Sequence, residues 1–163
     1  MKSFFAVFCI VIGLVLALVS TPLRAAGEAQ PKASTYFEAV PIVIDPQGQP
    51  LAAYQFELSS PNAELTIVGL ENGEHPAFAE APLYDVDAVN LGRADRIVVA
   101  AYSLRPGEEL PAQPTRVATV MVQVQLPPDT EPGADVVYQL DLIAAGNPAG
   151  QPIPVDLFRG AQP

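Results

Sequence analysis

The sequence predicts an all-β domain, an antiparallel β-sandwich of jelly-roll or immunoglobulin-like type with about seven to nine strands. Apolar and polar residues alternate with period two in several short runs, which is typical of strands with one buried face. The 18 prolines and 11 glycines fall mostly between those runs, where turns need them. Beyond the apolar N-terminal stretch, no segment sustains a helical period of 3.6 residues, apart from one possible turn at residues 87–91.

The first 26 residues are predicted to be a secretory signal peptide. A positive start, Met1-Lys2, precedes an apolar run over residues 4–20, and small residues follow at 25–27, which is the order found in signal peptides. The alternative is a retained N-terminal membrane anchor, because the run is close to the length that spans a bilayer. We expect cleavage, a secreted or periplasmic protein, and a polar linker over residues 27–34. Cleavage would leave six basic against 18 acidic residues, a net charge of −12, and no cysteine.

The first half of the domain, which is predicted to span residues 35–158, contains three expected strands. Residues 35–45 are rich in β-branched and aromatic side chains and end in a proline–glycine turn. The second strand, residues 51–59, places four apolar side chains on one face: Ala52, Tyr54, Phe56 and Leu58. A Ser-Pro-Asn break follows, and residues 63–70 form the third expected strand.

The second half of the domain contains four further expected strands. Residues 96–103 are apolar on both faces, which favours a central strand of the sandwich. Residues 115–126 alternate most regularly and place Ala118, Val120, Val122, Val124 and Leu126 on one face. Residues 135–145 alternate again, and residues 152–158 form the last expected strand before a tail over residues 159–163.

Residues 71–95 form the only connection in this pattern that is too long for a hairpin. Such connections are usually functional, disordered or a cover over a sheet edge. This one contains His75, the single histidine of the chain. We expect His75 to hydrogen-bond the connection to the sheet, and Phe78 and Tyr84 to pack onto an apolar face. The connection would then be an ordered cap.

Two kinds of ligand site are conceivable in and near this connection. Asp85, Asp87 and Asn90 place oxygen ligands close together, as a calcium site requires. The alternative is a solvated acidic loop, because the glycine and the distal glutamate of an EF-hand loop are missing. No other cofactor is expected. Tyr84 and Tyr102 are candidates for contact with a small ligand, since aromatic rings stack on flat molecules.

The sequence argues against an enzyme and against nucleic-acid binding. It has no GxSxG elbow and no phosphate-binding glycine loop, its only cysteine lies in the N-terminal apolar run, and His75 has no nucleophile near it in sequence. A strong negative charge disfavours nucleic acids and anionic lipid surfaces. Membrane contact is therefore expected only through an uncleaved N-terminal segment.

The order of these features resembles that of cohesin-like domains, which belong to a β-sandwich superfamily shared with the family 2 and 3 carbohydrate-binding modules. The local match is GQPLAAYQFELSSPNAEL, in which a strand runs into a polar turn and a second strand begins. TRVATVMVQV and DVVYQLDLIAAGNPAGQPIPVDL continue the similarity, so that it covers about residues 35 to 158. The resemblance implies a jelly-roll sandwich that acts as a docking receptor, whose partner in cellulosomes is a calcium-dependent dockerin.

These observations together predict a secreted, non-catalytic cohesin-like module that binds an exported protein partner, dockerin-like or other. The alternative is a polysaccharide-binding module of the same fold with a structural calcium ion. The chain has no tryptophan, the residue on which such modules often stack sugar rings.

Overall fold

The computed structural model describes residues 34–128, 130 and 135–161. The predicted signal peptide over residues 1–26, the linker except for its last residue, and the last two residues of the tail lie outside the described residues. Within the described ranges, no helix is long and apolar enough to cross a membrane.

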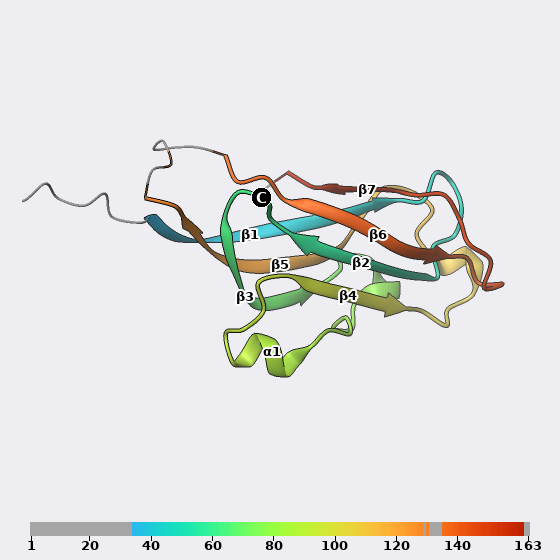
Figure 1. Ribbon diagram of the computed structural model, residues 1–163. Helices are drawn as coiled ribbons and strands as arrows, with labels where there is room; N and C mark the ends of the chain where they lie inside the picture. The colour runs from blue at the N-terminus through green and yellow to red at the C-terminus, as the bar shows by residue number, and fades with distance from the viewer. Residues whose placement is uncertain (1–33, 129, 131–134, 162–163) are drawn as a thin grey trace, which may run out of the picture.

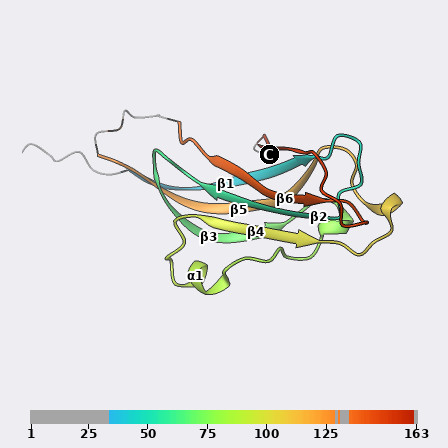
Figure 2. The ribbon, with the colours of Figure 1, turned by 45° about the vertical axis from the view of Figure 1, so that its right-hand side comes forward.

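The described residues form seven strands in two antiparallel sheets that pack face to face (Figures 1 and 2). The strands are β1 (Ser34–Asp45), β2 (Ala53–Ser59), β3 (Glu64–Asn72), β4 (Ile97–Tyr102), β5 (Thr115–Leu126), β6 (Gln139–Gly146) and β7 (Asp156–Arg159). The large sheet has the order β3-β5-β1-β7, and the small sheet has the order β4-β2-β6. All five strand pairings are antiparallel. The predicted β-sandwich is therefore confirmed.

The core lies between the sheets and is formed by alternate residues of the strands. The inward faces of β2 and β5 are those that the alternation predicts, and their apolar side chains are buried. A bulge between Ile42 and Val43 of β1 shifts the pairing with β5, so that Val117 and Ala118 are both fully buried. Tyr54 donates a hydrogen bond from its hydroxyl to the Val117 carbonyl at 2.9 Å, which joins the two sheets.

The expectation that residues 96–103 form a central strand is wrong, because β4 is an edge strand of the small sheet. The reason lies in the long connection. Leu83 crosses the free edge of β4 and forms a two-way backbone bridge with Ala100, with N···O distances of 2.7 and 3.0 Å. The edge is thus covered by a single residue of a loop, and an apolar sequence is tolerated on a strand that has only one full neighbour.

The last two strands begin later than the sequence predicts. The backbone groups of Asp135 and Val137 bond to the side chain of Asn62, at 3.0 and 2.9 Å, and β6 begins only at Gln139. Residues 152–155 carry two prolines, which lack a backbone donor, and β7 is confined to Asp156–Arg159. A bulge in the β2–β6 pairing turns Ile143 outward with 51% exposure.

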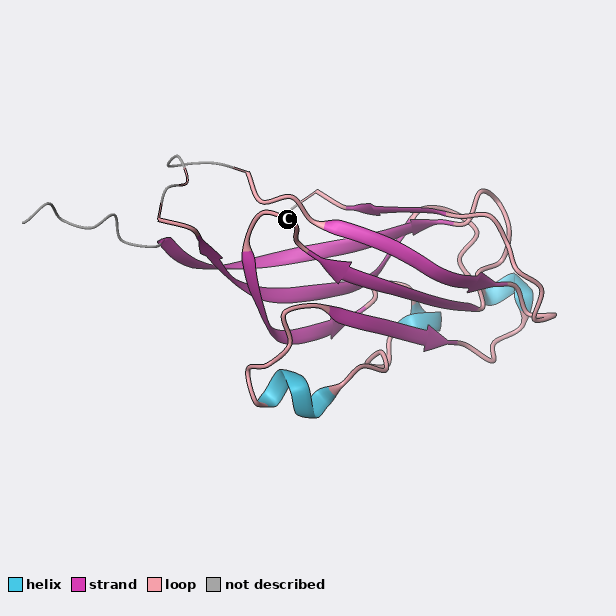
Figure 3. Cartoon of the chain, in the orientation of Figure 1, coloured by secondary structure: helices cyan, strands magenta, loops and turns pink. Residues whose placement is uncertain are grey.

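Among the described residues, three short helices lie in the connections and none in the core (Figure 3). They are η1 (Pro76–Phe78), α1 (Val86–Asn90) and η2 (Gly107–Glu109). The single helical turn predicted at residues 87–91 is α1. Both η1 and α1 belong to the connection between β3 and β4, which runs along the side of the sandwich.

Candidate functional site

The connection over residues 73–95 is an ordered cap, as predicted. Phe78 is only 3% exposed and meets the ring of Tyr54 edge to face, with ring centroids 5.1 Å apart. Tyr84 is half-buried and packs against the core. Leu83 adds the backbone bridge to β4 described above. The connection therefore contributes to the core of the sandwich and covers one of its edges.

His75 serves this cap in a different way from the one we expected. Its Nδ1 accepts a hydrogen bond from the Ala77 amide at 3.1 Å, so that it caps the short helix η1 within the connection. At this point of the connection, Glu74 makes the hydrogen bonds to the sheet instead. Its backbone amide donates to the Arg116 carbonyl and its Oε1 accepts from the Arg116 amide, both at 3.0 Å. Gly73 makes this approach possible, because a Cβ there would lie 2.9 Å from two carbonyl oxygens of β5.

The three residues proposed for calcium lie on or beside α1. Asp85 is the N-cap, and its Oδ1 accepts a hydrogen bond from the Ala88 amide at 2.9 Å. Asp87 follows in the first turn and Asn90 is the last helical residue. Side chains two positions apart do not face each other on a helix, so that the helical turn separates Asp85 from Asp87. In the described part of the chain, no three His, Cys, Asp or Glu side chains gather as metal ligands would. The calcium site stays a prediction.

Tyr84 and Tyr102 lie in different environments. Tyr84 packs inward against the core, whereas Tyr102 ends β4 with 65% of its surface exposed. Tyr102 is one of the residues that line a hollow on the outer surface of the protein. The ligand role proposed for the two tyrosines is untested, and of the two Tyr102 lines the hollow described next.

The hollow beside Tyr102 lies on the outer face of the small sheet and has a volume of about 430 Å³. We call it the alanine hollow, and the residues that define it are Ala53, Leu83, Ala100, Tyr102, Ala144 and Pro152. Register explains its floor: Ala100 of β4 and Ala144 of β6 both lie opposite Gln55 of β2. The two alanines flank the side chain of Gln55, which also lines the floor, and leave a shallow, mostly apolar depression.

A second hollow of about 630 Å³ lies on the other side of Leu83 and Tyr102, which line both. Leu83 is 62% exposed and Tyr102 65%, so that they form an exposed ridge between the hollows. Leu104 borders the second hollow with 91% exposure. Three large apolar side chains therefore stand exposed around two depressions, an arrangement typical of a protein contact surface. Leu104 and the alanines are functional candidates that the sequence did not single out.

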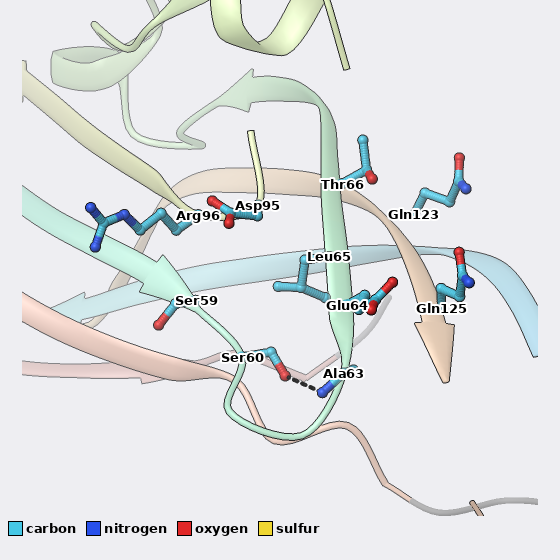
Figure 4. A pocket seen from close by; sticks show the side chains of 10 residues that line it. All are labelled: Ser59, Ser60, Ala63, Glu64, Leu65, Thr66, Asp95, Arg96, Gln123 and Gln125. Carbon is cyan, nitrogen blue, oxygen red and sulfur yellow. Dashed lines mark hydrogen bonds between the residues drawn. The ribbon is translucent and has the colours of Figure 1, made fainter. Parts of the chain in front are cut away.

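A third hollow, of about 480 Å³, lies at the turn between β2 and β3 and is polar (Figure 4). Ser60 closes this turn by accepting from the Ala63 amide at 3.2 Å. Glu64, Asp95 and Arg96 also line the hollow, and Arg96 lies 3.6 Å from Glu57 in an exposed ion pair. The hollow has mixed charge and no aromatic platform, so that it offers a protein partner less apolar area than the alanine hollow.

Comparisons with known proteins give the fold a name. No family model matches the chain, and no curated protein matches it. A chain from the crystal structure of a type I cohesin–dockerin complex of Clostridium thermocellum is similar, with 16% identity, a TM-score of 0.50, and coverage of 73% of this chain and 82% of that one. The chain has a cohesin-like fold. A non-cellulosomal cohesin from the archaeon Archaeoglobus fulgidus also matches, with 14% identity, a TM-score of 0.43, and coverage of 79% and 82%.

Proposed function

We propose that this protein is a non-catalytic binding module that holds a protein partner on the outer face of its small sheet. The observation that carries the proposal is the ridge of Leu83 and Tyr102 between two hollows, together with the exposed Leu104. Binding energy at protein interfaces concentrates in a few large side chains that meet a complementary pocket. Here the ridge supplies such side chains and the alanine hollow supplies the pocket.

The cohesin-like fold supports a partner of dockerin type. The similar Clostridium thermocellum structure is that of a cohesin bound to a dockerin, and the same fold in this chain presents the alanine hollow and the exposed ridge on its small sheet. The apolar run at residues 4–20 supports export, so that the partner would be an exported protein. The net charge of −10 over the whole chain favours a partner with basic residues around its apolar contact.

Ala144→Arg tests the proposal, because it places a long charged side chain in the alanine hollow from an exposed position on β6. Gln125→Arg is the matched control, since Gln125 is exposed on the large sheet. The binding of a panel of dockerin modules is measured by calorimetry with calcium present. We expect Ala144→Arg to weaken binding at least about tenfold, or about 1.4 kcal/mol, and the control to bind like the wild type.

Two results would contradict the proposal. Equal binding by wild type and Ala144→Arg would move the partner away from the small sheet. Saturable binding of a polysaccharide that Ala144→Arg abolishes, with no dockerin bound, would establish the carbohydrate-binding alternative instead. Circular dichroism and thermal unfolding of each variant show whether the fold is intact.

A further inference from the structure

The large sheet also has an apolar outer face. Along β1, every second residue from Phe37 to Val43 faces outward, and all of these residues are apolar. Phe37 is 71% exposed. A strand with apolar residues on both faces is usually covered on both faces, and β1 lies in the middle of its sheet between β5 and β7. On the outer face, Pro41 is buried beside Gly160, whereas Phe37 stays largely exposed.

The neighbouring strands extend this face. Gln123 of β5 lies directly opposite Phe37, and Met121 lies two residues before Gln123 on the same face. Met121 is half-buried. Phe158 of β7 lies directly opposite Val43 and is 43% exposed. Directly opposite and diagonal residues on one face of a sheet are close enough for their side chains to touch. We call these four residues, Phe37, Val43, Met121 and Phe158, the β1 face.

The β1 face is uncharged, although the chain has a net charge of −10. The register places Gln123 and Thr66 beside Phe37, and Thr119 and Gly69 beside Met121. Charged residues share this side of the sheet at both ends of the β1 face. Glu64 lies at the Phe37 end. At the Val43 end, Arg116 lies directly opposite Val43, Asp45 and Asp156 form the next pair, and Glu71 lies nearby on β3. The neutral, apolar part of this sheet face is therefore its centre, around Phe37 and Met121.

We propose that the β1 face is the contact surface for a second copy of this chain. Two copies repel each other wherever their acidic surfaces meet, because charges closer than about 10 Å still interact at 0.1 M salt. They approach most easily where the charges are absent. A basic partner, in contrast, would gain little attraction from a neutral face. A two-fold contact also needs only one self-complementary patch on each copy.

The shape of the face fits such a two-fold contact. Phe37 projects from β1, while Gly69 of β3 has no side chain and only Met121 approaches the place that its Cβ would occupy, at 4.0 Å. A projecting ring on one copy can therefore occupy the gap above Gly69 on the other, against an adaptable methionine. Four strands spaced about 4.8 Å apart, over the six steps of about 3.3 Å from Phe37 to Val43, give a face of roughly 400 Å² per copy, well below the ~800 Å² of a standard stable interface. The dimer is therefore weak and concentration-dependent.

Sedimentation equilibrium of the purified full-length product tests this inference, after mass spectrometry has established its N-terminus. The measurement covers about 10–300 µM protein, the range in which a weak dimer forms, at 0.05 M and 0.5 M NaCl. Phe37→Glu adds a charge to the β1 face at an exposed position. Leu104→Glu adds the same charge on the ridge side, where the side chain is 91% exposed. Comparison of the two variants isolates the β1 face from any association through the N-terminal segment.

We expect the wild type to dimerise, with a dissociation constant that falls at least about threefold as salt screens the repulsion. Phe37→Glu should raise that constant about tenfold or more, and Leu104→Glu should leave it within about twofold. Three results would overturn the inference: a wild-type monomer throughout, equal dimerisation by Phe37→Glu, or loss of the dimer in Leu104→Glu. The inference is independent of the proposed function, because partner binding is placed on the other sheet and is measured separately.

Discussion

Phe78 provides the sharpest test of the role of the long connection, and its truncation in Phe78→Ala should destabilise the whole domain. The side chain is 3% exposed and lies edge to face with Tyr54. Phe-to-Ala changes in protein cores cost about 3–5 kcal/mol, and an aromatic pair adds about 0.5–1.5 kcal/mol. Because η1 is a short helix in a loop and can relax around the cavity, we take the lower end, about 3 kcal/mol.

The assay is urea unfolding followed by tyrosine fluorescence and far-UV circular dichroism, since the chain has no tryptophan. A loss of about 3 kcal/mol corresponds to a fall in Tm of roughly 12 °C for a domain of this size. Leu104→Ala is the matched control, because its side chain is 91% exposed and its removal should change the unfolding free energy by no more than about 0.5 kcal/mol. A loss below about 1 kcal/mol for Phe78→Ala, at an unchanged m-value, would mean that the connection is a loop resting on the surface and not part of the core.

Two further predictions concern the acidic helix and the buried tyrosines. Asp85 caps α1, so Asp85→Ala should lower the unfolding free energy by about 0.5–2 kcal/mol. The loss should be the same with a chelator and with about 5 mM calcium, a concentration above the dissociation constants of extracellular calcium sites. A calcium-dependent rise in Tm that Asp85→Ala removes would establish the metal site instead. Burial raises the pKa of Tyr54, and burial with the Glu38 hydrogen bond raises that of Tyr138, above the ordinary value of 10.0. Because the folded-state pKa is the higher one, this contribution to stability is complete below pH 10 and is lost as the pH rises further. The loss is up to about 1.4 kcal/mol per pH unit for the buried Tyr54 and smaller for the half-buried Tyr138, where solvent screens the charge. Urea unfolding between pH 9 and about 11.5 should show a shallower decline in Tyr54→Phe, and parallel profiles would contradict the assignment.

The sequence predicts the strands well where side-chain alternation alone determines the structure. β5 has the bounds that the pattern indicates, Thr115–Leu126, because the inward residues from Ala118 to Leu126 are apolar and turn residues flank the strand. The helical turn near residue 87 and the anchoring by Phe78 were also predictable, since an aromatic residue in a polar loop needs a place to be buried. The alternation does not report long-range partners. The Asn62 side chain that bonds to Asp135 and Val137 is far away in sequence.

The candidate site was less predictable than the fold. The sequence indicates Tyr102 as a candidate for ligand contact, but Ala100 and Ala144 are ordinary strand residues until the register places both opposite Gln55. Leu104 carried a usable signal, since a large apolar residue in a proline-rich surface loop has no neighbours that would bury it. Depressions of this kind arise from the pairing of strands that are distant in the chain, and single-strand patterns do not contain that information.

The way the strand edges are covered explains why recognition is placed on the sheet faces. Leu83 pairs with Ala100 at the edge of β4, the Ala94 carbonyl accepts from Ile67 on β3 at 2.8 Å, and Ile153 donates to Ala145 on β6 at 3.1 Å. The remaining edge strand, β7, has only four residues. Loops thus occupy backbone groups that an added strand would need, which is how natural sheets avoid edge-to-edge pairing.

With the edges protected in this way, side chains on the outer faces are the groups left to contact a partner. The two faces differ in kind: the small sheet has hollows and a ridge, and the large sheet has a flat neutral centre. That difference leads us to assign a foreign protein partner to the first and a second copy of the chain to the second.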